Sequence, residues 1–130
     1  MLQAKTIMKK DVLTVSPDTP LEKAIRILIQ HNITGLPVVD DDMTVAGIIT
    51  EKDVLKFLAE KSVAELHPDI ARTPVKKLMC AEVVSFNQET DVRQIWDCLV
   101  KRNFRRVPIT DQDGRLVGII SRKDIIAVIA

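Results

Sequence analysis

The sequence predicts a mixed α/β (α+β) fold built from two tandem β-α-β-β-α repeats related by a pseudo-twofold axis. The chain aligns with itself without a gap from Lys5 to its C-terminus when Met8 is placed on Met79. In both copies the apolar pattern changes between strand-like and helical spacing in the same order. The identical pairs include Val12/Val83, Thr19/Thr90, Leu28/Leu99, Asn32/Asn103, Pro37/Pro108, Asp40/Asp111, Gly47/Gly118, Ile48/Ile119, Ile49/Ile120, Lys52/Lys123 and Asp53/Asp124.

Composition supports a packed domain and excludes several classes of partner. Of the 130 residues, 46% are hydrophobic and 28% are charged, which is typical of a folded domain. The net charge of +1 argues against attraction of the whole chain to nucleic acid or to an anionic membrane. One Trp, three Phe and no Tyr leave few rings on which bases could stack.

The termini and cysteines predict a cytoplasmic protein with no metal site. The N-terminus lacks the apolar core of a signal peptide, and no apolar run approaches the roughly 20 residues of a membrane span. Cys80 and Cys98 do not form a CxxC or CxxH pattern.

Each repeat opens with a short extended run, at residues 12–15 and 83–86, followed by a helix. Thr19, Pro20 and Glu22 have the order of a capping box, so we expect the first helix to be capped by Thr19. The faces expected to be buried are Leu21, Ala24, Ile25 and Leu28 in one copy and Val92, Ile95, Trp96 and Leu99 in the other.

The second half of each repeat predicts a helix stop, two strands and a second helix. Asn32 and Asn103 are suited to the left-handed backbone of a helix end. Strands are expected at 36–39 and 45–49 and again at 107–110 and 116–120, joined by acidic turns. The second helices open at Thr50 and Ser121. The predicted organisation is residues 1–59 as first repeat, 60–74 as connector with one helical turn at 63–66, and 75–130 as second repeat.

The strongest local motif runs from a strand end into a helix start, as Gly47-Ile48-Ile49-Thr50-Glu51-Lys52-Asp53 and again from Gly118 to Asp124. A helix N-terminus presents unpaired N–H groups to a phosphate, the hydroxyl could touch that phosphate, and the Asp could accept hydrogen bonds from a ribose diol. The alternative is that the Thr/Ser-x-x-Asp spacing is only a helix cap. Duplication does not separate the two, because a cap would also be repeated.

Arg105 and Arg106 form a second candidate. Their counterparts in the first repeat are Thr34 and Gly35, so the copies differ most in charge at this place. Paired guanidinium groups suit phosphate recognition. A solvated basic turn is the alternative.

No catalytic constellation is present in the sequence. His31 and His67 have no nucleophile or metal partner at a telling spacing, and neither a Walker motif nor GxGxxG occurs. We therefore expect a protein that is not an enzyme.

The doubled pattern, with Pro37-Val38-Val39-Asp40 followed by the Gly47 to Asp53 motif, closely resembles the CBS domain, named after cystathionine β-synthase. The resemblance covers the chain from about Lys5 to Ala130 and implies a CBS-domain pair, or Bateman module. Such modules bind adenosyl ligands between their repeats and respond by changing shape. The resemblance thus implies an AMP, ADP, ATP or S-adenosylmethionine ligand and no required cofactor.

The family pattern implies two crossed sites. One combines Ile48, Thr50, Lys52 and Asp53 with Met79, Val83, Val84, Phe104, Arg105 and Arg106. The other combines Ile119, Ser121, Lys123 and Asp124 with Met8, Val12, Leu13, Ile33, Thr34 and Gly35. In this pattern the Asp holds the ribose, apolar side chains sandwich the base, the hydroxyl touches phosphate, and the residues two and three before the Pro face the phosphates.

The asymmetry between the copies predicts unequal sites. The site of Asp53, Arg105 and Arg106 should favour a charged nucleotide, and the site of Asp124 and Thr34 a less anionic adenosyl compound or none. A homodimer is expected from the apolar second helices, and the regulated protein partner is not identified by any motif. The alternatives are an interaction module without a nucleotide, an S-adenosylmethionine sensor, and nucleic-acid binding through residues 101–106.

Overall fold

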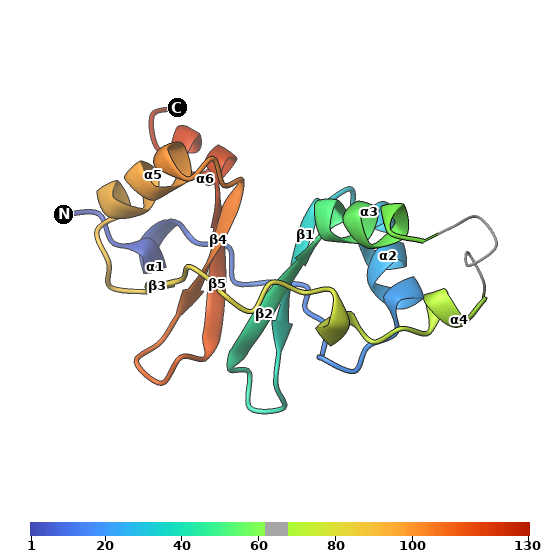
Figure 1. Cartoon of the computed structure of the whole chain (residues 1–130). Coiled ribbons are helices and arrows are strands. Elements are labelled where there is room, and N and C mark those ends of the chain that lie inside the picture. The colour runs from blue at the N-terminus through green and yellow to red at the C-terminus, as the bar shows by residue number, and fades with distance from the viewer. Residues whose placement is uncertain (62–67) are drawn as a thin grey trace. The chain divides into compact units, whose positions relative to one another are not determined.

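The computed structural model describes residues 1–61 and 68–130, which form two compact units (Figure 1). The central unit is Leu13–Val83, and the C-terminal unit joins Met1–Val12 to Val84–Ala130. The helical turn expected at 63–66 lies outside the described residues.

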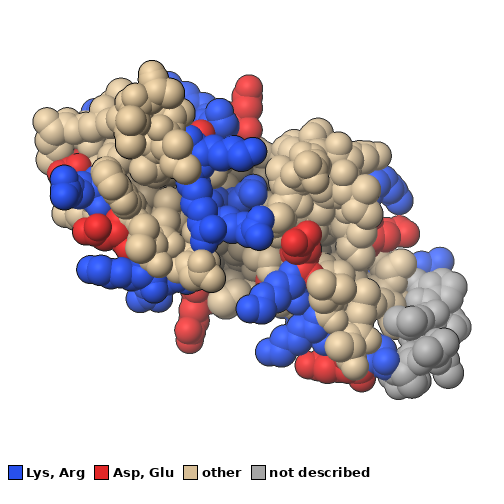
Figure 2. Space-filling model, turned by 90° about the horizontal axis from the view of Figure 1, so that it is seen from above, with Lys and Arg blue, Asp and Glu red and all other residues tan. Residues whose placement is uncertain are grey.

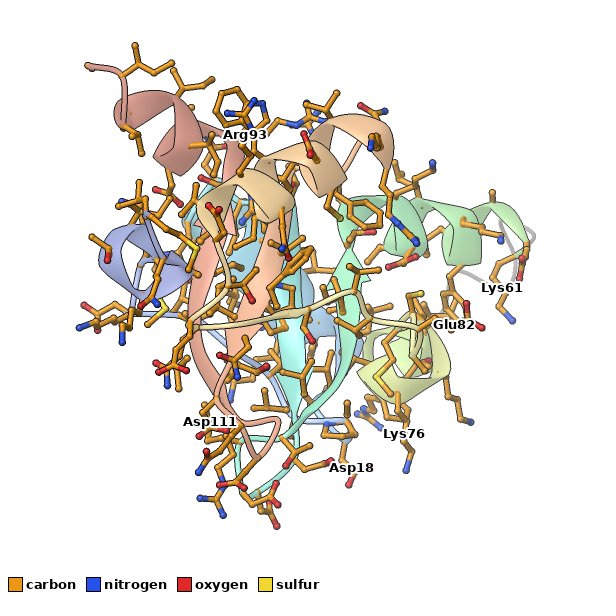
Figure 3. All side chains as sticks on the ribbon, turned by 90° about the vertical axis from the view of Figure 1, so that its left-hand side faces the viewer. Asp18, Lys61, Lys76, Glu82, Arg93 and Asp111 are labelled. Carbon is orange, nitrogen blue, oxygen red and sulfur yellow. The ribbon has the colours of Figure 1, made fainter. Side chains whose placement is uncertain are left out.

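The central unit is a β-hairpin with helices before and after it. Strands β1 (Gly35–Val39) and β2 (Val45–Thr50) pair antiparallel, and Val15 adds a parallel bridge to Val38. Its other elements are α2 (Leu21–Gln30), α3 (Glu51–Ala59), α4 (Pro68–Ala71) and the 3₁₀ helix η2 (Val75–Lys77). Asp18 and Lys76, both labelled in Figure 3, form an ion pair of 2.8 Å that ties η2 to the turn before α2.

The C-terminal unit repeats this plan. Strand β4 (Arg106–Thr110) pairs antiparallel with β5 (Leu116–Ser121) and parallel with the short β3 (Phe86–Asn87). The helices are α1 (Ala4–Ile7), α5 (Val92–Lys101) and α6 (Arg122–Ala127). Two mixed α+β units with the same order of hairpin and helices confirm the predicted fold class.

Each compact unit includes the short segment that opens the other repeat. Residues 1–12 belong to the C-terminal unit, and residues 75–83 belong to the central unit. In the C-terminal unit the Lys9 N–H donates to the Ile119 carbonyl and the Ile119 N–H donates to the Lys9 carbonyl, each at 2.9 Å. In the central unit Cys80 and Ile48 exchange the same pair of bonds, at 2.8 and 3.0 Å. The compact units therefore divide the chain differently from the repeats of the sequence.

Each unit has its own apolar core, formed by the predicted helix faces and strands. The central core contains Val15, Leu21, Ala24, Leu28, Leu36, Val38, Ile49, Val54 and Val75. The C-terminal core contains Ala4, Ile95, Leu99, Val107, Ile109 and Ile120. Trp96 was expected to be buried, but 45% of it is exposed, because its side of α5 lies outside this core.

The expected cap of the first helix is wrong. Pro20 stands at the N-cap of α2 and makes no side-chain cap bond, while the Thr19 hydroxyl accepts a hydrogen bond from the Ser16 N–H at 2.9 Å. The Leu21 N–H donates to the Thr73 carbonyl at 2.8 Å. A tertiary contact thus replaces the local cap.

Left-handed backbone occurs at equivalent places in both units. Asn32 and Asn103 have φ values of 50° and 55°, which confirms the predicted helix stops. In the hairpin turns Met43 has a φ of 71° where the second copy has Gly114 at 79°. No helix among the described residues combines the length and apolar character needed to cross a membrane.

Candidate functional site

The turn from β2 into α3 forms a complete capping box. The Thr50 hydroxyl oxygen accepts from the Asp53 N–H at 3.2 Å, and Asp53 Oδ2 accepts from both the N–H and the hydroxyl of Thr50 at 2.9 Å. The capping interpretation of this motif is therefore correct as a description of the turn. It uses only one carboxylate oxygen, so Oδ1 of Asp53 remains outside the cap.

The turn from β5 into α6 has the same geometry. Asp124 Oδ2 accepts from the Ser121 N–H at 2.8 Å and from its hydroxyl at 3.0 Å. Its other oxygen, Oδ1, lies 3.5 Å from Lys9 Nζ. The Asp124 side chain is 8% exposed and that of Lys9 is 71% exposed, so the ion pair joins a buried carboxylate to a solvated amine.

A methionine covers the glycine of each motif. A Cβ built on Gly47 would lie 2.7 Å from Met79 Sδ and 2.8 Å from the Cys80 carbonyl oxygen. A Cβ on Gly118 would lie 2.5 Å from Met8 Sδ and 3.0 Å from the Lys9 carbonyl oxygen. Only glycine leaves room for this close approach, which brings Met79 and Met8 next to the strand that leads to each acid.

The basic turn before β4 is held by α6. Arg122 donates from Nε to the Phe104 carbonyl at 2.8 Å and from Nη2 to Asn103 Oδ1 at 2.9 Å. Arg105 is exposed, whereas Arg106 is half-buried and faces Ser121 across the β4–β5 ladder. Burial and the neighbouring Arg105 lower the pKa of Arg106 from its ordinary value, and Asp124 opposes this shift. Arg106 is thus more than a residue of a solvated turn, and it remains a cation.

The equivalent turn of the central unit is uncharged. The Thr34 carbonyl accepts from the Glu51 N–H at 2.9 Å, and Gly35 pairs with Thr50. A Cβ on Gly35 would lie 3.3 Å from the Thr50 methyl carbon. In Figure 2 basic side chains gather together on the visible face of the molecule.

The predicted site residues divide evenly between the units. The central unit holds Leu13, Ile33, Thr34, Gly35, Ile48, Thr50, Lys52, Asp53, Met79 and Val83. The C-terminal unit holds Met8, Val12, Val84, Phe104, Arg105, Arg106, Ile119, Ser121, Lys123 and Asp124. Each crossed site therefore takes six residues from one unit and four from the other, and the crossed combination remains a prediction.

Two hollows within the units lie away from these residues. A hollow of about 290 Å³ in the central unit is lined by Thr14, Val15, Ser16, Thr19, Lys23, Val39, Asp40 and Asp41. A groove of about 160 Å³ between α5 and α6 is lined mainly by apolar side chains.

Lys9 was missed by the sequence reasoning. It occupies the place of Cys80 in the aligned repeats, so the comparison that singled out Arg105 and Arg106 would also have found it. Its amine lies 3.5 Å from Oδ1 of the Asp124 carboxylate.

The fold and the duplicated motif define a tandem pair of CBS domains. The family model for the CBS domain matches residues 4–60 and 75–130, and the chain belongs to this family. Inosine-5'-monophosphate dehydrogenase of Thermoplasma acidophilum is 37% identical over 122 residues, which are 94% of this chain and 22% of that protein. The chain thus spans about a fifth of the length of this enzyme.

Two solved structures of CBS pairs are similar over almost the whole chain. CBSX2, a chloroplastic protein of Arabidopsis thaliana, was solved in complex with AMP; it has 27% identity and a TM-score of 0.86, and the match covers 99% of this chain and 96% of that one. The CBS domain pair of protein MJ0100 was solved with 5'-methylthioadenosine and S-adenosyl-L-methionine, with 29% identity, a TM-score of 0.81 and the same coverage. The ligands of both structures belong to the adenosyl class that the resemblance implied.

Proposed function

We propose that this CBS pair is a non-catalytic regulatory module that binds an adenosyl ligand and signals by a change of conformation. The duplicated acid of the capping box carries the proposal. In each unit one carboxylate oxygen of the acid accepts the hydrogen bonds of the helix cap, and the other oxygen takes no part in the cap. A carboxylate held in this way is suited to accept the two hydroxyl hydrogen bonds of a ribose.

The ligand of the Asp53 site is proposed to be an adenine nucleotide, AMP, ADP or ATP. Arg105 and Arg106 supply two permanent cations for its phosphates, and Arg122 fixes the turn that carries them. This site would use the crossed set of residues, so its ligand would bridge the two units. The Asp124 site, with Thr34 opposite, would take a less anionic adenosyl compound or stay empty.

Signalling would follow from that bridge. A ligand can shift an equilibrium between two arrangements only by as much as its affinity differs between them. A tenfold difference in affinity corresponds to about 1.4 kcal/mol, enough to change which arrangement predominates when the two are nearly balanced. The regulated partner would then read the arrangement of the units. A cytoplasmic location stays a prediction, since a relative is chloroplastic.

We also propose that the module is a homodimer. Several apolar side chains on the helices are exposed, including Leu55 at 66%, Val100 at 70% and Ile126 at 65%, as is Ile129 just after α6 at 82%. Apolar surface gathered on the helices of both units fits burial against a second copy of the chain better than permanent exposure to water.

Isothermal titration calorimetry with AMP, ADP, ATP and S-adenosylmethionine tests the ligand. Asp53→Ala should weaken AMP binding by about tenfold or more, since hydrogen bonds to a charged group contribute about 1.5–3 kcal/mol. Asp124→Ala, the same change in the other unit, should leave AMP affinity within about twofold, a difference of only about 0.4 kcal/mol. Arg106→Ala should weaken AMP binding, and Arg102→Ala, an exposed arginine at the end of α5, is its control.

The opposite ranking of the two aspartates would refute the site assignment. Tighter binding of S-adenosylmethionine than of any nucleotide would favour the sensor of that compound. A folded protein that binds none of the four ligands would make an interaction module the better description.

A further inference from the structure

The two units hold the same backbone contact beside the acid but place different side chains there. Lys9 is bonded to Ile119 in both directions, as Cys80 is to Ile48. The side chains of residues 9 and 80 therefore start from equivalent points next to Asp124 and Asp53. One is a lysine whose amine reaches the acid, and the other is an exposed cysteine.

This difference changes which oxygens of each carboxylate are available to accept a hydrogen bond from a ligand. In Asp124, Oδ2 serves the helix cap and Oδ1 faces the Lys9 amine at 3.5 Å. In Asp53, Oδ2 also serves the cap, but among residues 1–61 and 68–130 no lysine or arginine forms an ion pair with its Oδ1. A ribose that binds through Oδ1 finds it open in the central unit and occupied in the C-terminal unit.

We propose that Lys9 is a specificity-determining residue that weakens the Asp124 site by competing with the ribose of the ligand for the carboxylate. The inference rests on the proposed function, because it takes the acid to be the ribose partner. The backbone of Lys9 is pinned by two hydrogen bonds, so its amine stays within reach after it is displaced. The substitution of lysine for cysteine in the duplicated segment then adds to the inequality that Arg105 and Arg106 create between the two sites.

The competition is modest and depends on salt. Because the Lys9 amine is solvated, we take the range of exposed ion pairs, about 0.2–1 kcal/mol, which corresponds to about a 1.4- to fivefold effect on affinity. The Debye length falls from about 10 Å at about 0.1 M salt to about 3 Å at about 1 M, close to the separation of the two groups. Salt should therefore release the carboxylate from Lys9.

Adenosine is the probe that tests this, because it carries a ribose and no phosphate. All proteins carry Asp53→Ala, so that only the Asp124 site remains. At low salt, Lys9→Cys should bind adenosine about 1.4- to fivefold more tightly than the protein with Lys9. At high salt the two affinities should converge. Lys10→Cys removes the same charge from the neighbouring exposed residue and should change nothing.

The reciprocal substitution, a lysine at position 80, tests the proposal independently if Lys9→Cys folds poorly. With Asp124→Ala in the background, Cys80→Lys should weaken adenosine binding at Asp53, and high salt should restore it. Equal affinities with and without the lysine, or an equal gain from Lys10→Cys, would overturn the role of Lys9 and leave the proposed function standing. Absence of binding for adenosine and for every nucleotide would overturn both.

Discussion

The central and C-terminal units share their backbone contacts and differ in the charges that those contacts carry. Both have a capping box at the second helix, a methionine over a glycine and a pinned residue beside the acid. At equivalent positions the central unit has Cys80, Thr34, Gly35 and Glu51, where the C-terminal unit has Lys9, Arg105, Arg106 and Arg122. Hydrogen bonds made by the main chain thus survive side-chain changes, so the two units keep one backbone arrangement around the acid while the charges beside it differ.

The exposed apolar helices provide the test with the largest expected effect. On its helices the C-terminal unit exposes Trp96, Val100 and Ile126, and the exposed Val128 and Ile129 follow α6 directly, whereas the helices of the central unit expose Ile29 and Leu55. Ile126→Glu should therefore weaken the proposed dimer by more than about a hundredfold, since burying an unpaired charge costs about 3–5 kcal/mol. Leu55→Glu should weaken it less.

Analytical ultracentrifugation of the three proteins measures this effect. Ile126→Val is the control, because it keeps an apolar side chain and should leave the dimer intact. A monomeric parent protein at micromolar concentration would remove the dimer from the proposal, and a stronger effect of Leu55→Glu would reverse the ranking of the two faces.

The covered glycines give the next largest effect. Gly47→Ala should destabilise the protein by about 1–3 kcal/mol, because its Cβ would press on the Cys80 carbonyl oxygen at 2.8 Å. Gly118→Ala meets the Lys9 carbonyl at 3.0 Å and otherwise the flexible end of Met8, so its cost should be smaller. Urea unfolding of both variants measures the difference in the free energy of unfolding.

Trimming the methionine is the control for this comparison. Gly47→Ala combined with Met79→Ala removes the sulfur but not the carbonyl, so most of the clash should persist. If the double variant recovers the stability of Met79→Ala alone, the side chain and not the backbone is the obstacle.

We expect the smallest effect from substitutions in the two hairpin turns, which should change the free energy of unfolding. Met43 adopts a φ of 71°, which costs a non-glycine residue about 1–2 kcal/mol, while Gly114 adopts 79° without that cost. Met43→Gly should therefore raise the free energy of unfolding by up to about 1 kcal/mol, because the relief of strain exceeds the entropy lost by glycine. Gly114→Ala should lower it, and thermal unfolding compares the two. A Met43→Gly protein that is less stable than the parent would show that the Met43 side chain contributes more than the strain costs.

The duplication and the local motifs could be predicted from sequence because they depend on residue type. Asn32 and Asn103 tolerate positive φ, and Thr50 and Ser121 stand three residues before an acid, so the helix stops and second caps were predicted correctly. The cap at Thr19 was wrong because the Leu21 N–H finds a partner in Thr73, more than fifty residues along the chain.

Features that depend on tertiary contacts could not be predicted from the sequence. The segments around Lys9 and Cys80 are held in their units by main-chain hydrogen bonds, which do not depend on side-chain type. Since Met8 aligns with Met79, residue identity also does not show which glycine each methionine covers. The exposure of Trp96 follows from where the core ends on α5, which helical periodicity does not show. The two acids, their hydroxyl partners and the basic turn were found from sequence, while their combination into crossed sites stays a prediction.

The exchanged N-terminal segment also has a consequence for the order of events during synthesis. The Ala4 N–H bonds to the Thr90 carbonyl, and Lys9 pairs with Ile119. Residues 1–12 therefore cannot complete their contacts until the end of β5, more than a hundred residues later, has been synthesised. At about 5–20 residues per second, that wait lasts about 5–20 s on the ribosome. The central unit, which is continuous in sequence, can fold during this interval. Residues 1–12 are therefore synthesised before both β-hairpins but are among the last of the described residues to reach their folded contacts.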